Sequence, residues 1–399
     1  MSREEELVTK WFREYYSKSP PPLPPKHMER ELAFMYYGKD FMQRHMAFTE
    51  QATFNRFLTS RVPTHVYYST ALYQTPSAST MDAKVWKGAD LIFDLDADHI
   101  PGVEGLTYEE MLARVKKEMI RLLDDFILDD LGFSENDLEV TFSGGRGYHA
   151  HIYSEKVLKL KSHERSEIVD YVAGTDLDFD WVFPEKTKMY TKFKNGQRLD
   201  KGTSFPVEDS GGWKRRMNQG TRRLFEEFKD LSVVDSKIRY KSFAAVDEKL
   251  LSLLKKELFE VREDLTGAAL MFRDGTFDCI DDRVKKLLIG WLLDEVPKRS
   301  MAEVDQPVTR DIKRLIRLPY SLHGKTGLRV ISMKREELTD FDPLRDAFPD
   351  VFPDTPMTIK LARRIDMKLK KERFTGEGEI EVPTWAGIFM VLRKYGTIA

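Results

Sequence analysis

Hydrophobic positions in the first part of the chain alternate between helical and strand spacing. Leu7, Trp11 and Tyr15 fall at helical spacing and predict an amphipathic helix over residues 3–17. A proline-rich run at 19–25 ends it, because proline donates no backbone hydrogen bond. We interpret this run as a surface connection rather than as a ligand for a proline-recognising domain. Further along, the spacing predicts a helix over 108–131 and strands over 64–69, 89–95, 138–142 and 148–153.

The central part of the chain has a different pattern. Residues 162–300 are charged and mostly helical in spacing, most clearly over 246–262 and 280–295. A Gly/Ser/Lys-rich stretch at 194–220 interrupts them. This composition predicts a mostly helical insertion within a larger fold.

Strand and turn signals resume from Val304 onward. Residues 357–373 predict a basic helix, whereas the apolar run 388–392 fits either a strand or a helix. The simplest organisation is one α+β core in two parts, separated by the insertion. The predicted domains are residues 1–161 for the first part of the core, 162–300 for the insertion, and 301–399 for the second part with its basic helix.

The distribution of charge is uneven, although the whole chain is nearly balanced. Its 64 basic and 66 acidic residues give a formal net charge of -2. Three stretches are strongly basic: 185–223, 310–335 and 360–373. Each alone could be a solvated helix face, but three in a balanced chain favour an anionic ligand.

Cysteine content and the N-terminus restrict the class of protein. Cys279 is the single cysteine, so a disulfide framework and a Cys-rich zinc site are excluded, and a reducing environment is indicated. The N-terminus is too acidic for a signal or transit peptide, and no run approaches the roughly 18 apolar residues that span a bilayer. We therefore expect a soluble, intracellular protein without a membrane partner.

The segment Asp90–Asp98 contains the first candidate for chemistry. In a strand, side chains alternate between faces, so Asp94 and Asp96 would project together opposite Leu91, Phe93 and Leu95. Two adjacent carboxylates repel each other unless cations lie between them. Two-metal sites hold such ions roughly 3.5–4 Å apart. The alternative is a strand that simply enters an acidic turn.

The second candidate is the glycine-rich segment Ser143–His149. It matches part of a dinucleotide-binding fingerprint, but a strand follows where that fingerprint requires a helix, so we reject this interpretation. Glycines allow close backbone approach, and Ser143, Arg146 and His149 supply donors suited to a phosphate. A plain hairpin turn would explain the glycines but not these three polar residues.

The third candidate is residues 305–328. Thr309 could cap a short helix that buries Ile312, Leu315 and Ile316 and exposes Lys313, Arg314 and Arg317, with Pro319 ending it. A Walker A loop at Gly324 is excluded, because the position of the first glycine of that motif is occupied by Pro319. What remains is a basic helix, a polar turn with His323 and Lys325, and a carboxylate at Asp305.

Together the three segments resemble the catalytic small subunit of the archaeal and eukaryotic type of DNA primase. The sequences FDLDAD, SGGRGYH and RLIRLPYSLHGKTGL look like the three hallmark motifs of that family, in order and with fitting spacing. The resemblance covers about residues 28–340. It implies a two-layered core related to RNA-recognition-motif sheets, with a helical subdomain inserted.

The resemblance also implies an activity, partners and residue roles. The activity is template-directed synthesis of short primers from nucleoside triphosphates on single-stranded DNA, with a large primase subunit as partner. It implies that Asp94, Asp96 and Asp305 bind two Mg2+ or Mn2+ ions and act in catalysis. It further implies that Ser143, Arg146, His149, Arg317, His323 and, at slightly different spacing, Arg44 with Glu31 serve the nucleotide.

One departure from the family concerns zinc. Family members usually carry a Cys/His zinc site near the second carboxylate, yet residues 99–135 contain no cysteine. We therefore predict no zinc, and because such a site is structural, its loss need not cost activity. Three rival functions stay open: a polymerase that only extends primers, a metal-dependent phosphodiesterase, and a catalytically silent nucleic-acid-binding module.

Overall fold

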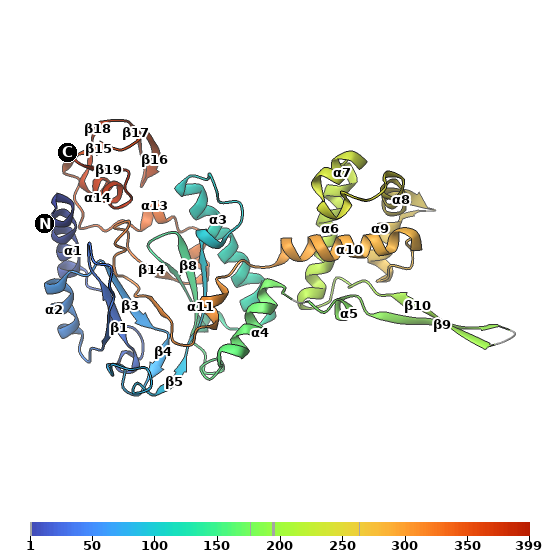
Figure 1. Cartoon of the computed structure of the whole chain (residues 1–399), viewed down its shortest axis with the longest axis horizontal. Coiled ribbons are helices and arrows are strands. Elements are labelled where there is room, and N and C mark those ends of the chain that lie inside the picture. The colour runs from blue at the N-terminus through green and yellow to red at the C-terminus, as the bar shows by residue number, and fades with distance from the viewer. Residues whose placement is uncertain (1, 176, 194–195, 263) are drawn as a thin grey trace. The chain divides into compact units, whose positions relative to one another are not determined.

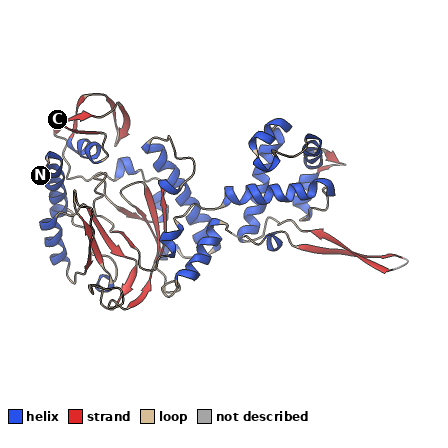
Figure 2. Ribbon diagram, in the orientation of Figure 1, coloured by secondary structure: helices blue, strands red, loops and turns tan. Residues whose placement is uncertain are grey.

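The computed structural model describes residues 2–175, 177–193, 196–262 and 264–399. The chain forms two compact units, one from Met1–Val169 with Glu303–Ala399 and the other from Asp170–Ala302 (Figure 1). Both helices and strands are abundant, so the protein is of mixed helix and sheet class (Figure 2). The domain boundaries expected after residues 161 and 300 stay a prediction.

Two four-stranded antiparallel sheets form the centre of the first unit, ordered β13-β3-β1-β2 and β14-β7-β8-β6. Each sheet takes one edge strand, β13 or β14, from the chain beyond the second unit, so both parts of the chain are required to complete them. The strands are β1 Leu32–Met35, β2 Gln43–Met46, β3 His65–Ser69, β6 Leu91–Asp96, β7 Leu138–Phe142, β8 Gly147–Ile152, β13 Leu315–Arg317 and β14 Ile331–Met333.

Helices and smaller sheets surround these two sheets. The smaller sheets are β4–β5, β16–β17 and the three-stranded β18-β15-β19. Their strands are β4 Ala71–Tyr73, β5 Trp86–Ala89, β15 Pro356–Leu361, β16 Ile365–Leu369, β17 Glu372–Gly376, β18 Glu379–Pro383 and β19 Gly396–Ile398. The helices are α1 Arg3–Lys18, α2 Gln51–Arg61, α3 Tyr108–Arg121 with a π-helical continuation Leu122–Asp130, α4 Ser162–Ala173, α11 Gln306–Arg310, α12 Arg335–Leu338, α13 Pro343–Asp346 and α14 Thr384–Leu392.

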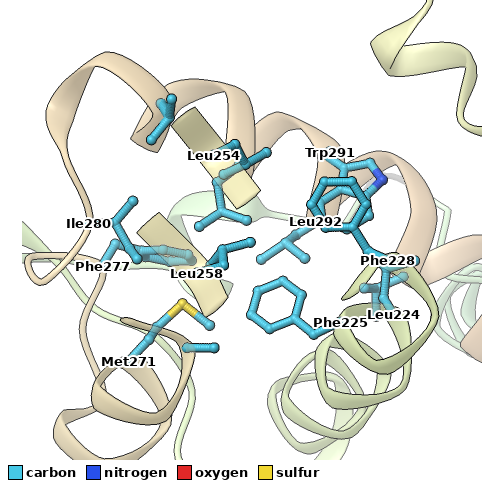
Figure 3. Close-up of a cluster of buried hydrophobic side chains, with 14 of the residues drawn as sticks. Leu224, Phe225, Phe228, Leu254, Leu258, Met271, Phe277, Ile280, Trp291 and Leu292 are labelled. Carbon is cyan, nitrogen blue, oxygen red and sulfur yellow. The ribbon is translucent and has the colours of Figure 1, made fainter. Parts of the chain in front are cut away.

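The second unit is mainly helical and has its own core. Helices α6 and α10 cross so closely that a Cβ on Gly220 would lie 2.3 Å from Val296 Cγ1. Phe225 stacks on Trp291 at a centroid distance of 6.1 Å within a cluster of buried apolar side chains (Figure 3). The elements are α5 Phe179–Val182, β9 Glu185–Phe193, β10 Gly196–Thr203, α6 Gly212–Asp230, α7 Val233–Arg239, α8 Glu248–Phe259, β11 Val261–Arg262, β12 Leu265–Thr266, α9 Gly267–Asp274 and α10 Asp282–Ser300.

Most elements expected from the spacing are present. Helices α1, α3, α8 and α10 and strands β3, β6, β7 and β8 all occupy their predicted places within a few residues. Residues 388–392, which fitted either a strand or a helix, belong to α14. The Gly/Ser/Lys-rich stretch contains β10 and the start of α6, while residues 194–195 lie outside the described residues. None of the described helices combines the length and apolar character needed to cross a membrane.

The prediction of a basic helix over residues 357–373 is wrong. These residues form β15, β16 and β17, and the buried positions Ile359 and Leu361 in β15 and Ile365 and Leu369 in β16 alternate with exposed ones. Lys360, Arg364, Lys368 and Lys371 lie three or four residues apart, which imitates a helical face in this short segment. The apolar residues repeat every two or four positions, and burial of one face of each strand decided the structure.

The helix predicted to begin at Thr309 is also wrong. Asp305 precedes the short helix α11, whose first turn contains Pro307, and Thr309 is buried inside it. Residues Leu315–Arg317 form strand β13 and pair with β3. Backbone pairing with an existing sheet overrides the weak local helical preference of this segment.

Candidate active site

Strand β6 carries the paired carboxylates. Leu91, Phe93 and Leu95 are buried, whereas the side chains of Asp94 and Asp96 are 19% and 33% exposed. The strand ends in a single 3-10 turn, where Asp96 accepts a hydrogen bond from the Asp98 backbone N–H at 3.1 Å. Alternation along the strand therefore directs both carboxylates to one face, as the sequence pattern predicts.

Asp305 lies beside this pair, although more than two hundred residues separate it from them in sequence. Its backbone N–H donates to the Asp94 carbonyl at 2.8 Å, which fixes the start of α11 against β6. Burial, followed by the charges of Asp96 and Asp305, raises the pKa of Asp94 to about 7. Three carboxyl groups are thus concentrated at this point of the fold.

The glycine loop joins β7 to β8 and lies next to the carboxylates. Ser143 Oγ accepts hydrogen bonds from the backbone N–H groups of Gly145 and Gly147, at 3.4 and 3.3 Å, and so holds the loop closed. Strand register sets His149 opposite Asp94, with 3.5 Å between Nε2 and Oδ1. Arg146 is ion-paired with Asp98 and approaches Asp96 at 3.7 Å.

Strand β13 and the turn after it bring further polar side chains to the glycine loop. Arg317 Nη1 donates to His65 Nδ1 at 2.6 Å, and the His65 ring lies 4.9 Å from that of His323. The His323 turn is tied to the loop by Thr326, whose hydroxyl donates to the Gly144 carbonyl at 2.6 Å. Segments that precede and follow the insertion in sequence therefore lie side by side at this site.

These segments enclose a cavity of about 500 Å³. Its acidic side is formed by Asp94 and Asp96, and Asp305 adjoins Asp94 without lining the cavity itself. The predicted nucleotide residues Ser143, Arg146, His149, Arg317 and His323 all line it. Other lining residues, which motif matching had not assigned a role, are Tyr67, Arg314, Lys325, Thr326 and Arg393.

The histidines of the cavity are neutral imidazoles in the folded protein. Burial, followed by the charge of Arg317, lowers the pKa of His149 to about 3 and that of His323 well below its usual value. His149 Nδ1 is buried and has no hydrogen-bond partner among the described residues. These rings can exchange hydrogen bonds with a ligand, whereas positive charge is supplied by the arginines and Lys325.

Arg44 and Glu31 are placed elsewhere. Arg44 Nε and Nη2 bind the two carboxylate oxygens of Glu31 at 3.1 and 3.2 Å, and Lys84 Nζ lies 2.5 Å from the same carboxylate. Burial alone would raise the pKa of Glu31, but hydrogen bonds from Arg44 and Lys84 outweigh it and lower that pKa. Neither residue lines the cavity, so a nucleotide role for Arg44 stays a prediction.

The residues of the cavity suit hard divalent cations by their chemistry. Carboxylate oxygens are the ligands that Mg2+ and Mn2+ prefer. Within the described ranges, no three His, Cys, Asp or Glu side chains form a group ready to hold an ion as they stand. Burial, followed by the charges of Asp96 and Asp305, raises the pKa of Asp94, and a bound cation would oppose both effects.

Gly144 permits the close contact between the glycine loop and His323. Its φ is +75°, and a Cβ would lie 2.7 Å from His323 Cβ. We expect Gly144→Ala to displace His323 and to lower nucleotide affinity, besides about 1–2 kcal/mol of backbone strain. Gly132→Ala is the matched control, because its φ is +65° with no atom within 4 Å. Equal nucleotide affinity in the two variants, measured by titration, would contradict this role.

Clustered carboxylates that face basic side chains and a glycine loop form the kind of site that nucleotidyl transferases use for a nucleoside triphosphate. Residues 93–335 match the family model of the DNA primase small subunit. The chain is 41% identical to the DNA primase small subunit PriS of Methanococcoides burtonii, with 96% of this chain and 97% of the relative covered. It is 37% identical to that of Methanocella arvoryzae over 96% and 95%, and 38% identical to that of Methanothrix thermoacetophila over 97% and 97%.

The chain belongs to the DNA primase small subunit family. It is therefore an enzyme of the kind that makes primers on DNA, and the resemblance of its three motifs is confirmed.

Proposed function

We propose that this chain synthesises short primers from nucleoside triphosphates on a single-stranded DNA template, using the cavity between β6, the glycine loop and β13. The observation that supports this assignment most strongly is that acidic and basic side chains line the same cavity. Asp94 and Asp96 lie on one side, and Arg146, Arg314, Arg317 and Lys325 line the remainder. A triphosphate with bound divalent ions carries the complementary charges.

Asp94, Asp96 and Asp305 are the residues that would hold two Mg2+ or Mn2+ ions. Bound ions would acidify the attacking 3′-hydroxyl and compensate charge on the leaving pyrophosphate. The carboxylates themselves contribute position: β6 holds Asp94 and Asp96 two residues apart, and the Asp305–Asp94 backbone hydrogen bond of 2.8 Å keeps the third close.

The basic and polar side chains of the cavity would bind the triphosphate. Arg317 is fixed by His65 and lies over the Tyr67 ring at 5.1 Å, so it presents its guanidinium to a phosphate with little loss of side-chain entropy. Arg146 would exchange Asp98 for the triphosphate. Ser143, His149 and His323 would orient phosphate oxygens through hydrogen bonds.

The proposal also includes the type of core, the partner subunit and the location of the protein. We infer that the two four-stranded sheets are the RNA-recognition-motif-like layers of a primase core. A large primase subunit would position the initiating nucleotide, since no duplex exists at that step. Because the template is replicating DNA, we place the protein inside the cell.

Nucleotide incorporation on an unprimed template tests the function directly. The protein, reconstituted with a large subunit, is given single-stranded DNA, labelled nucleoside triphosphates and Mn2+ or Mg2+. We expect short labelled products that begin with a triphosphate. A primed template and a labelled strand without triphosphates serve as parallel reactions.

Each rival function predicts a different outcome. Products only on the primed template would identify a primer-extending polymerase, and shortening of the labelled strand would identify a phosphodiesterase. Strand binding without any reaction would identify a silent binding module. Any of these three results would overturn the proposal.

A further inference from the structure

A second cavity adjoins the active site within the same unit. It has a volume of about 390 Å³ and is lined by the start of α3 and by strand β16. We name it the α3–β16 groove; its lining includes residues 106–109 and 363–369. Arg393 lines both this groove and the active-site cavity, so the two lie next to each other at that side chain.

The charge of the groove is strongly positive. Its basic lining residues are Arg363, Arg364, Lys368 and Arg393, and its acidic ones are Glu109 and Asp366. Asp366 is already neutralised by Arg373, whose Nε and Nη2 donate at 2.8 and 2.8 Å. In the part of the chain that the structure describes, no carboxylate pairs with Arg364 or Lys368. The groove therefore has an excess of basic over acidic side chains, which a bound anion would balance.

The β16–β17 hairpin holds these cations on a fixed support. Its inner face is buried through Ile365 and Leu369, Phe374 contacts Trp385 at a centroid distance of 5.8 Å, and the Lys370 N–H donates to the Leu344 carbonyl at 2.6 Å. On its outer face Lys368 lies directly opposite Arg373. Arg373 is paired with Asp366, so Lys368 is the basic side chain of this strand pair that a bound anion would contact.

Arg393 lies between the groove and the glycine loop. Its guanidinium lies 4.2 Å from the centre of the Tyr108 ring, and the Tyr108 hydroxyl donates to the Gly145 carbonyl. Arg393 Nε is buried and has no hydrogen-bond partner among the described residues. A cation is thus held at the junction between the groove and the glycine loop.

We propose that the α3–β16 groove binds the phosphodiester backbone of the single-stranded template next to the active site. This inference rests on the proposed primer synthesis and adds the path of the strand. The basic side chains Arg363, Arg364 and Lys368 of the groove are exposed, and its rings Tyr108 and Tyr395 are half-buried, a combination that suits the phosphates and bases of a single strand. A duplex is stiff and would contact only the rim of such a cavity, whereas a single strand can enter it.

Charge reversal in the groove tests the proposal. The variant Arg364→Glu with Lys368→Glu changes two exposed side chains, and the control Lys10→Glu with Arg56→Glu makes the same change in net charge on α1 and α2. Binding of a fluorescein-labelled single-stranded oligonucleotide is measured by anisotropy across a salt series. We expect at least about tenfold weaker binding in the groove variant, and a slope of log K against log salt reduced by about 1–2.

Two further measurements separate this inference from the proposed function. Binding of ATP with Mn2+ should be equal in wild type and in the groove variant, and thermal unfolding should be unchanged. If strand affinity falls no further than in the control, or falls only for a duplex of the same sequence, the groove proposal is wrong. If the groove variant no longer binds a large subunit but keeps its affinity for the strand, the groove proposal is also wrong. None of these results alters the test of primer synthesis itself.

Discussion

Asp96→Ala is expected to lower nucleotide incorporation by at least about a thousandfold, equivalent to roughly 4 kcal/mol of transition-state stabilisation. Asp96 lines the catalytic cavity and is one of the charges that raise the pKa of Asp94. In the proposed mechanism its removal deletes one of the three carboxylates that would hold the cations. Because the side chain is partly exposed and unnecessary for packing, thermal stability in the absence of divalent ions should not fall.

Asp98→Ala is the matched control for this change. Asp98 follows Asp96 by two residues and is ion-paired with Arg146, but it is exposed and does not line the cavity. We expect its loss to reduce incorporation less than tenfold. Calorimetric titration with Mn2+ gives an independent measurement, in which Asp96→Ala should weaken binding and Asp98→Ala should not. Equal incorporation by wild type and Asp96→Ala would refute the metal assignment.

Asp90→Asn is expected to destabilise the first unit by about 3–5 kcal/mol, because it leaves a buried arginine without its counter-charge. Asp90 Oδ2 lies 2.5 Å from Arg30 Nη2 and 2.9 Å from His151 Nε2, with side chains that are 3% and 1% exposed for Asp90 and Arg30. Arg30 also donates to the Ser69 and Thr70 carbonyls. The network therefore joins the start of β6 to β8 and to the end of β3.

Thermal or urea unfolding measures this loss, with Asp124→Asn as the control. Asp124 accepts two hydrogen bonds from Arg335 at 2.6 and 2.6 Å, but it is half-exposed, so its replacement should cost no more than about 1 kcal/mol. Similar losses in the two variants would show that burial of the Asp90 pair is unimportant. Incorporation should follow stability, since Asp90 does not line the cavity.

The Asp90 network also predicts the direction of a pH effect. Burial alone would raise the pKa of Asp90, but hydrogen bonds and charge from His151 and Arg30 outweigh it and lower that pKa below 3.8. The native state then binds fewer protons than the unfolded state as the carboxylate begins to titrate. Its contribution is complete above about pH 4 and is lost as the pH falls through the lowered pKa. Asp90→Asn should remove this part of the acid sensitivity.

Local periodicity was sufficient to predict the strand that carries the two aspartates. Alternation in residues 91–96 reports which side chains share a face, and pairing with a neighbour does not change that relation. The glycine turn was predictable for a similar reason, because β7 and β8 adjoin it in sequence. Motif order then identified the family, which the comparisons confirm.

Short segments whose structure depends on distant partners were predicted wrongly. Leu315–Arg317 has no strong local preference and becomes a strand by pairing with β3. The charges over 357–373 imitate a helical face, while burial against α14 and α13 favours strands. Propensity is a weak influence, and tertiary packing overrides it in segments of this length.

By itself, the sequence determined the two-aspartate strand, the glycine loop and membership of the primase family, because each motif consists of residues close together in the chain and the order of the motifs can be read along it. Only the tertiary structure decided that Asp305 is hydrogen-bonded to Asp94, that His65 holds Arg317, and that Arg393 joins the cavity to the α3–β16 groove. These contacts link residues separated by hundreds of positions. The raised pKa of Asp94 depends on the same convergence, since burial and neighbouring charge exist only once the chain has folded.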